Sequence, residues 1–245
     1  GKTGEYMKKV NITIDKKTYG VRESVKTLRT NLRFCGDDKQ VILMTSCLPG
    51  EGKTDTSIEL AKSIAEMGNS VVLVDADMRK SVMVSRLQAT NVDKGLSHFL
   101  SGQCVLADAL VSTNIPKMHL MVAGPAVPNP TELLETKRFQ GMIDSMRKVY
   151  DYIIIDCPPL GLVVDAAIVA KECDGAILVV ESAKTKYRLA QSVKEKLEYT
   201  GVPILGVVLN KVERKKNSGY YNKYYGKEYK KDNYEGYYSS VEKKK

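Results

Sequence analysis

The 245-residue sequence contains no tryptophan, three phenylalanines and only two histidines. His98 and His119 have no companions at ligand spacing, so a zinc or other transition-metal site is not expected. The five cysteines are odd in number and form no CxxC pair, which argues against a disulfide framework and indicates a reducing compartment. No apolar run approaches the ~18 residues that span a bilayer, and no secretory signal is recognisable. We therefore expect a cytoplasmic protein.

Positive charge, in contrast, is abundant. The formal net charge is +9, from 38 Lys and Arg against 29 Asp and Glu. Residues 213–245 alone carry ten Lys or Arg against five Asp or Glu, so much of the excess lies at the C-terminal end. A basic protein suits an anionic partner, such as nucleotide phosphate, nucleic acid or a membrane surface, but charge does not choose among them.

Apolar runs of strand length alternate with helical patterns along most of the chain. The runs are continuous rather than alternating, as expected of strands covered on both faces; they lie at 41–46, 71–77, 119–124, 152–159, 175–182 and 203–210. Helical patterns lie at 21–35, 54–67, 132–149, 165–172 and 186–199, with a short core helix expected within 95–102. This order predicts βαβ units and a doubly wound α/β fold with a mainly parallel sheet.

The last 33 residues differ in composition from the rest of the chain. The segment 213–245 has almost no aliphatic residues and holds eight of the fourteen tyrosines. It cannot bury enough apolar surface to offset its chain entropy. We therefore predict a domain over 1–212 and a mobile tail over 213–245. Composition alone leaves three uses open for the tail: a substrate segment, a single-strand nucleic-acid binder or a solubilising extension.

The stretch "TSCLPGEGKTD" follows a predicted strand and opens a predicted helix. Its "GEGKT" is the end of the Walker A pattern, in which glycine amides and a helix N-terminus surround phosphate oxygens. Lys53 is expected to reach the β and γ phosphates, and the Thr54 hydroxyl to bind Mg²⁺. The first glycine of the strict pattern is replaced by Cys47. The residues predicted to form the phosphate site are Pro49, Gly50, Glu51, Gly52, Lys53, Thr54 and Asp55.

Three aspartates follow apolar runs. "VVLVDADMR" ends one strand with Asp75 and Asp77, and "YIIIDCPP" ends another with Asp156. The carboxyl ends of strands line the ligand crevice of a doubly wound sheet. Three carboxylates there would repel one another unless a cation lay among them, and nucleotide-bound Mg²⁺ is that cation. The alternative is that each Asp only caps the following turn or helix. Arg79 either stabilises the phosphates or the crevice, or is a solvated arginine.

These motifs together resemble the deviant Walker group of P-loop ATPases, which gives the expected fold a three-layer α/β/α form. Partition and septum-positioning members of that group usually carry a lysine early in the phosphate loop, where this chain has Leu48. The sequence instead resembles the bacterial tyrosine kinases (BY-kinases) of capsular and exopolysaccharide synthesis. "AGPAVPNPTELL", "RESVKTLRTNLRF" and the tyrosine-rich tail agree with that family.

The resemblance implies an ATP- and Mg²⁺-dependent protein-tyrosine kinase that phosphorylates its own tail in trans. It implies that Asp75 accepts the tyrosine proton, that Asp77 and Asp156 hold Mg²⁺ with Thr54, and that Lys53 and Asp77 take part in catalysis. Asn210 would read adenine, although a strand-ending turn residue is the alternative. The implied phosphoacceptors are Tyr220, Tyr221, Tyr224, Tyr225, Tyr229, Tyr234, Tyr237 and Tyr238.

The resemblance also implies partners. The family's ExxRxxR helix mediates ring assembly, and its counterparts here are Glu23, Lys26 and Arg29. The lysine keeps the charge of the family's first arginine but loses the planar fork. A transmembrane activator of the polysaccharide co-polymerase type would recruit the chain to the inner face of the membrane, a cognate phosphatase would reverse its phosphorylation, and nucleic acid would not be a partner. A nucleotide-gated assembly ATPase of the partition type is the alternative function, and anionic lipid the alternative ligand of the basic helix.

Overall fold

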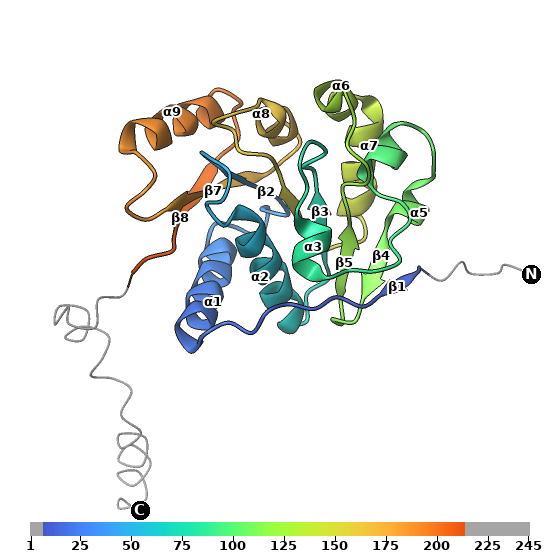
Figure 1. The fold of residues 1–245 in the computed structure, drawn as a ribbon, viewed down its shortest axis with the longest axis horizontal. Helices are drawn as coiled ribbons and strands as arrows, with labels where there is room; N and C mark the ends of the chain where they lie inside the picture. The colour runs from blue at the N-terminus through green and yellow to red at the C-terminus, as the bar shows by residue number, and fades with distance from the viewer. Residues whose placement is uncertain (1–6, 214–245) are drawn as a thin grey trace, which may run out of the picture. The chain divides into compact units, whose positions relative to one another are not determined.

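The computed structural model describes residues 7–213, which contain an eight-stranded sheet flanked by helices (Figure 1). The strand order across the sheet is β1-β4-β5-β3-β6-β2-β7-β8. All neighbouring strands run parallel except β4 and β5, which are antiparallel. The strands are β1 (Lys9–Val10), β2 (Val41–Ser46), β3 (Val71–Asp75), β4 (Val111–Thr113), β5 (Met118–Met121), β6 (Tyr152–Asp156), β7 (Gly175–Glu181) and β8 (Ile204–Asn210).

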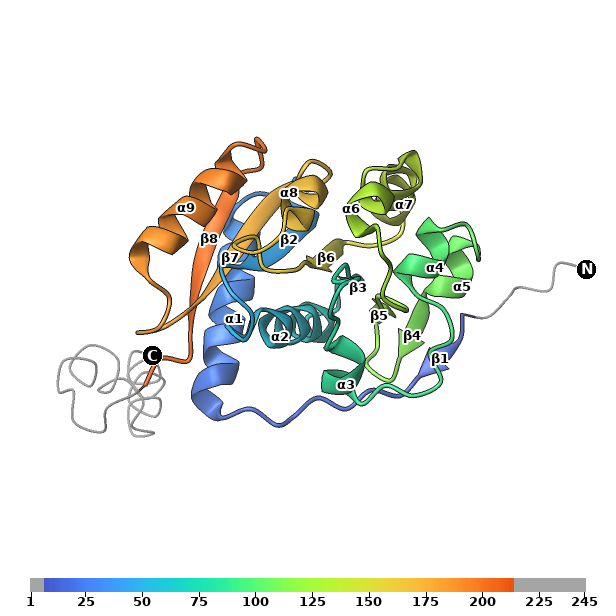
Figure 2. The ribbon, with the colours of Figure 1, turned by 45° about the horizontal axis from the view of Figure 1, so that its top comes forward.

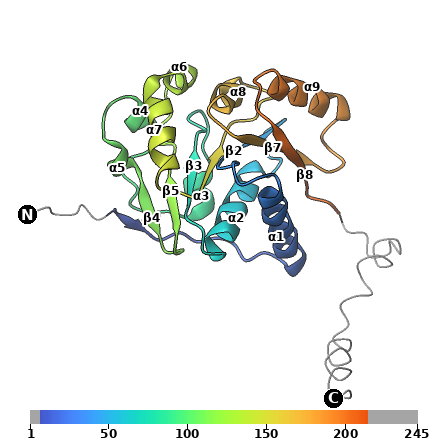
Figure 3. The ribbon, with the colours of Figure 1, turned by 180° about the vertical axis from the view of Figure 1, so that it is seen from behind.

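Helices cover both faces of this sheet (Figure 2). One layer consists of α1 (Tyr19–Phe34), α2 (Lys53–Glu66) and α3 (Met83–Leu87). The other consists of α4 (Leu96–Leu100), α5 (Leu106–Ala109), α6 (Pro130–Leu134), α7 (Lys137–Arg147), α8 (Asp165–Ala170) and α9 (Tyr187–Glu198). The view from behind shows the same two layers on either side of the strands (Figure 3). The predicted doubly wound, mainly parallel α/β/α fold is therefore confirmed.

The strands have two buried faces, which is why their sequences are continuously apolar. In β2, Leu43 packs into the core beneath α7, α8 and α9, whereas Ile42 and Met44 pack into the core beneath α1 and α2. Neighbouring side chains of a strand point to opposite faces. Every residue of β2 and β3 is buried as a result.

Some elements differ from the sequence-based expectation. The predicted single helix over 132–149 is two helices, α6 and α7, because the Thr136 hydroxyl accepts the Phe139 amide (3.3 Å) and starts a new helix. Strands β1 and β4 and helices α3 and α5 were not predicted, since two to five residues carry no measurable period. The short core helix within 95–102 is present as α4.

Within residues 7–213, no helix has both the length and the apolar character needed to cross a membrane. The proposed tail over 213–245 lies outside the described residues except for Glu213, so the domain boundary near residue 212 stays a prediction.

Candidate active site

The phosphate loop and two of the three predicted aspartates meet at the carboxyl ends of the central strands. Strands β3, β6 and β2 are neighbours, and Asp75 of β3 is directly paired with Asp156 of β6. The phosphate loop leaves the carboxyl end of β2, which is the strand on the other side of β6. The strand order therefore brings together residues that are far apart in the sequence, such as Lys53 and Asp156, which are separated by 103 positions, as expected for an open α/β sheet.

Two glycines shape the phosphate loop. Gly50 and Gly52 have φ of 80° and 88°, a left-handed conformation that residues with a Cβ rarely adopt. Gly52 caps α2, and no side chain accepts from the first amides of that helix. Uncapped amides at a helix N-terminus provide donors and a positive dipole end for an anion. The loop thus fits a phosphate group.

Lys53, Thr54 and Asp156 form a buried polar cluster at the start of α2. Lys53 Nζ lies 2.8 Å from Asp156 Oδ1, and Thr54 Oγ1 donates to Asp156 Oδ2 at 2.7 Å. Burial by itself would lower the pKa of Lys53, but the charges of Asp156, Asp75 and Asp77 outweigh it and raise that pKa. Lys53 is therefore a cation at neutral pH.

Ser57 joins this cluster and was not singled out from the sequence. Its hydroxyl donates to the Lys53 carbonyl (2.9 Å) one turn back and lies 3.3 Å from Asp156 Oδ1. Its position one helical turn after Lys53 was the only available signal, because i and i+4 share a helix face.

Asp75 is almost completely buried. Its Oδ1 accepts the amide of Asp77 (3.0 Å), and its Oδ2 accepts the Ser81 hydroxyl. Burial, followed by the charge of Asp156, raises the pKa of Asp75 to about 7. A carboxyl group with that pKa can take up a proton near neutral pH, which is what a general base requires.

Asp77 lies on the turn that follows β3. Its Oδ1 accepts the amides of Arg79 (3.2 Å) and Lys80 (2.9 Å), so part of its carboxylate shapes the turn, as the capping alternative anticipates. Among the described residues, no three His, Cys, Asp or Glu side chains are grouped closely enough to form a metal cage. Mg²⁺ does not require one, because it is usually bound through one or two carboxylates and completes its octahedron with water and phosphate oxygens. The residues present therefore fit Mg²⁺ bound together with a nucleotide.

Arg79 is committed to a partner that the sequence did not reveal. Its Nε and Nη2 donate to the two carboxylate oxygens of Asp165, each at 2.9 Å. Asp165 is completely buried at the start of α8. This bidentate pair joins the turn after β3 to α8, and it replaces the solvated arginine that was one of the two expectations.

The remaining predicted nucleotide residues lie on or beside the loop. Asn210 donates from Nδ2 to the Glu51 carbonyl (3.0 Å), and a Cβ on Gly52 would approach that nitrogen to 1.9 Å. Asp55 is on the outer side of α2, with an oxygen 3.8 Å from Arg86 Nε. Pro49 is exposed, whereas Glu51 is buried. Adenine recognition by Asn210 stays a prediction.

Cys47 occupies the position of the missing first glycine. It is completely buried, and burial, followed by the charge of Glu51, raises the pKa of its thiol to about 11. The thiol is therefore protonated at neutral pH and is a packing group in the loop.

The predicted assembly residues lie on α1, away from the phosphate loop. Lys26 pairs with Glu23 (2.7 Å) on the exposed face. Arg29 donates to the Ser63 carbonyl and hydroxyl of α2, both at 2.9 Å, so this arginine holds two helices of its own chain together. All eight predicted phosphoacceptor tyrosines lie outside the described residues.

Comparisons with known proteins agree with this geometry. Residues 39–196 match the family model described as an AAA domain. The chain is 44% identical over 190 residues to the tyrosine-protein kinase CpsD of Streptococcus agalactiae, covering 78% of this chain and 82% of that protein.

Solved structures of tyrosine kinases and of related ATPases also resemble this chain. The kinase domain of the Escherichia coli tyrosine kinase ETK matches with a TM-score of 0.77 and 29% identity, covering 81% of this chain and 78% of that chain. The septum site-determining protein MinD of Pyrococcus horikoshii, complexed with Mg-ADP, matches with a TM-score of 0.63 and 27% identity over 72% of each chain. The chain therefore belongs to the bacterial tyrosine kinase family and is a P-loop protein-tyrosine kinase whose phosphoryl donor is ATP.

Proposed function

We propose that this kinase transfers the γ-phosphoryl group of Mg·ATP to the tail tyrosines of a second copy, and that this reaction regulates capsular or exopolysaccharide synthesis. The observation that carries the proposal is the placement of Asp75, with a pKa of about 7, beside Asp156 and the Lys53 ammonium. Such a group can hold the acceptor's proton where phosphate charge is neutralised.

The residues would share the work of phosphoryl transfer as follows. The tyrosine oxygen bonds to the γ-phosphorus, its proton passes to Asp75, and the bond from phosphorus to the β,γ-bridging oxygen breaks to release ADP. Lys53 and the amides at the start of α2 stabilise the phosphate charge. Mg²⁺, when bound through Thr54, Asp77 and Asp156, supplies further charge neutralisation.

The charge balance of the site supports a divalent cation. Lys53 lies within the field of Asp75, Asp77 and Asp156, so the carboxylates outnumber the ammonium group. Like charges this close disfavour one another's ionised forms unless a cation is added. Since nucleotide phosphates add further negative charge, Mg²⁺ is the expected companion of ATP here.

Assembly and recruitment are further parts of the proposal. Two large apolar side chains at opposite ends of α1, Tyr19 and Phe34, are 63% and 82% exposed, and each could be covered by another copy in a ring. Glu23 and Lys26 would pair across that contact. A transmembrane activator would bring the ring to the inner face of the membrane, and a tyrosine phosphatase would restore the unmodified tail.

A nucleotide-gated assembly ATPase is the second candidate function, because the fold also matches MinD. Leu48 occupies the loop position where partition ATPases usually carry a lysine, which favours the kinase reaction. ATP hydrolysis without any phosphotyrosine, with the activator present, would support the assembly ATPase instead.

Mass spectrometry of protein purified from cells that also express the activator tests the proposal. We expect phosphate on several of the eight tail tyrosines, and none in Lys53→Met. The matched control is Lys62→Met, which changes a partly exposed lysine of the same helix. A wild-type tail without phosphate, or an equally phosphorylated Lys53→Met, would contradict the assignment.

A further inference from the structure

Glu51 is a buried carboxylate inside a loop that is expected to bind phosphate. Its side chain is 3% exposed. Oε2 accepts the amides of Cys47 (2.8 Å) and Leu48 (2.9 Å), and Oε1 accepts the hydroxyl of Thr185. Both oxygens are thus occupied by donors from the protein. A carboxylate aimed at a nucleotide phosphate would repel it, so this side chain acts on the loop itself.

Thr185 connects Glu51 to the end of β7. Its hydroxyl accepts the Glu181 amide (2.9 Å) while donating to Glu51. The phosphate loop follows β2, and β7 is its neighbour in the sheet on the side away from β6. The Glu51–Thr185 contact therefore joins the phosphate loop to the turn between β7 and α9, across 134 residues of sequence.

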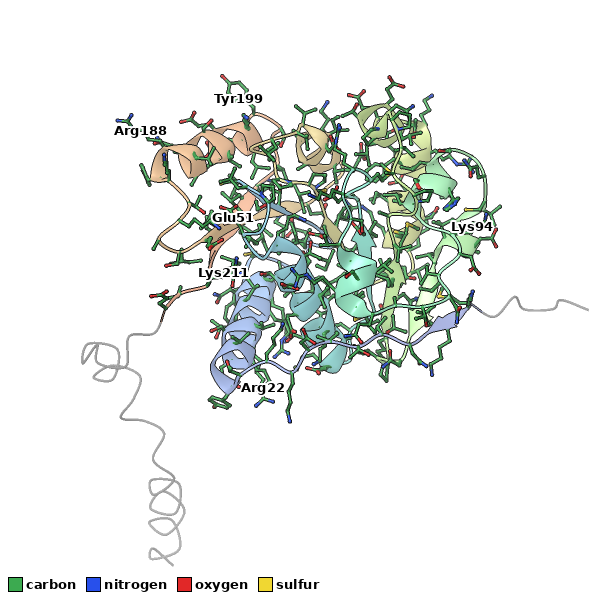
Figure 4. The ribbon with its side chains drawn as sticks, viewed as in Figure 1. Arg22, Glu51, Lys94, Arg188, Tyr199 and Lys211 are labelled. Atoms are coloured by element: carbon green, nitrogen blue, oxygen red, sulfur yellow. The ribbon has the colours of Figure 1, made fainter. Side chains whose placement is uncertain are left out.

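Two more tethers reach the same part of the loop from the end of β8. Asn210 donates to the Glu51 carbonyl, and Lys211 donates to the Gly50 carbonyl. Lys211 Nζ also lies 3.1 Å from Glu181 Oε2. Figure 4 labels Glu51 and Lys211, which lie close together at this edge of the sheet. Gly50 and Glu51, in the middle of the phosphate loop, are thereby fixed to the ends of β7 and β8.

These tethers matter because two residues of the loop have no side chain that could anchor it. Gly50 and Gly52 adopt left-handed conformations and supply no side chain. A loop that becomes ordered only when the ligand binds loses conformational entropy, and this loss weakens the affinity. A loop that is already ordered avoids this loss. We propose that Glu51 is a positioning residue, which holds the phosphate loop ready for nucleotide by capping its first amides and bonding to Thr185.

Thr185 offers a clean test, because the change can avoid the loop altogether. Thr185→Val removes the hydroxyl and keeps the shape, whereas Thr185→Ser keeps the hydroxyl. We measure ADP affinity by isothermal titration calorimetry and, in the same samples, the melting temperature of the nucleotide-free protein. We expect about a five- to tenfold weaker ADP affinity for Thr185→Val and restored affinity for Thr185→Ser.

Thr200→Val is the matched control. The Thr200 hydroxyl donates to the Leu197 carbonyl and accepts the Val202 amide (3.2 Å), so it performs the same turn-forming role at the other end of α9. Its loss lowers the melting temperature as Thr185→Val does, but we expect ADP affinity to stay within twofold of wild type. Equal losses of ADP affinity in the two variants, or none in Thr185→Val, would overturn the proposal.

A double-mutant cycle connects the effect to Glu51. Glu51→Met weakens ADP binding by itself, and we expect Thr185→Val to add less than twofold in that background because methionine has no side-chain oxygen to accept the Thr185 hydroxyl and the shared contact is already lost. If the loss of ADP affinity in the double variant equalled the product of the two single losses, the two side chains would act independently, which would contradict the proposed contact. The inference rests on the proposed function only in taking the loop as the nucleotide site. ADP titration involves no tyrosine, so the absence of phosphotyrosine would leave this test intact.

Discussion

Lys53 Nζ lies 2.8 Å from Asp156 Oδ1, and both side chains are less than 10% exposed. The pair joins the first residue of α2 to the last residue of β6. The carboxylate thus holds the ammonium group that phosphate oxygens are expected to contact. Removing one member of a buried pair leaves the other charge without compensation.

Asp156→Asn is therefore expected to lower the free energy of unfolding. Lys53 would lose its hydrogen-bonded carboxylate, while the charges of Asp75 and Asp77 remain, so the loss should be about 2–4 kcal/mol, somewhat below that of a fully uncompensated buried charge. Urea denaturation at pH 7.5 measures it. Asp144→Asn, at an exposed position of α7, is the control and should change stability by less than about 0.5 kcal/mol. Equal stability of Asp156→Asn and wild type would show that the pair contributes nothing.

The raised pKa of Asp75 predicts a pH-dependent stability in nucleotide-free, EDTA-treated protein. The folded state binds the proton of Asp75 up to about pH 7, whereas an unfolded aspartate releases it near pH 4. The contribution of Asp75 to the free energy of unfolding is therefore most favourable below about pH 4, and this stabilisation is lost as the pH rises to about 7.

Asp75→Asn imitates the protonated form at every pH. We expect this variant to be more stable than wild type by on the order of 2–4 kcal/mol at pH 8, and the difference to shrink towards zero near pH 4. Denaturation curves at pH 4.5, 6 and 8 provide the measurement. A difference that does not change with pH would mean that Asp75 has an ordinary pKa.

Ser81 provides a second means of changing the proposed base. Its hydroxyl donates to Asp75 and lowers the pKa of that carboxyl, because a hydrogen bond to the charged form favours it. Ser81→Ala should thus move the rise of kcat/KM with pH towards higher pH. Ser85→Ala, an exposed serine of α3, should leave the profile in place. A profile unchanged by Ser81→Ala would argue against Asp75 as the proton acceptor.

The Arg79–Asp165 pair distinguishes a structural arginine from a phosphate-binding one. Arg79→Ala leaves Asp165 completely buried without its partner, and we expect a loss of about 3 kcal/mol in unfolding free energy. ADP affinity should change little. The opposite result, with normal stability and weakened ADP binding, would place Arg79 at the phosphates.

The strands were predictable because burial on both faces leaves a continuous apolar run, as in β2 and β7. The positions of Lys53, Asp75 and Asp156 followed from motifs tied to strand ends. The contacts of Thr185 and Asp165 did not follow, since each joins residues 86 or more positions apart and such a pair leaves no local pattern. The break between α6 and α7 depended on one capping threonine, which competes weakly with helical periodicity.

Phosphate transfer between two copies can be measured by separating the active kinase from the tail that is read. Lys53→Met with its tyrosines intact is mixed with an otherwise wild-type chain whose eight tail tyrosines are all phenylalanine, together with ATP, Mg²⁺ and the activator. Mass spectrometry then reads the tail of the Lys53→Met copy. We expect phosphotyrosine within 220–238 of that copy. A tail that stays unmodified in this mixture, while wild type alone becomes phosphorylated, would contradict transfer between copies.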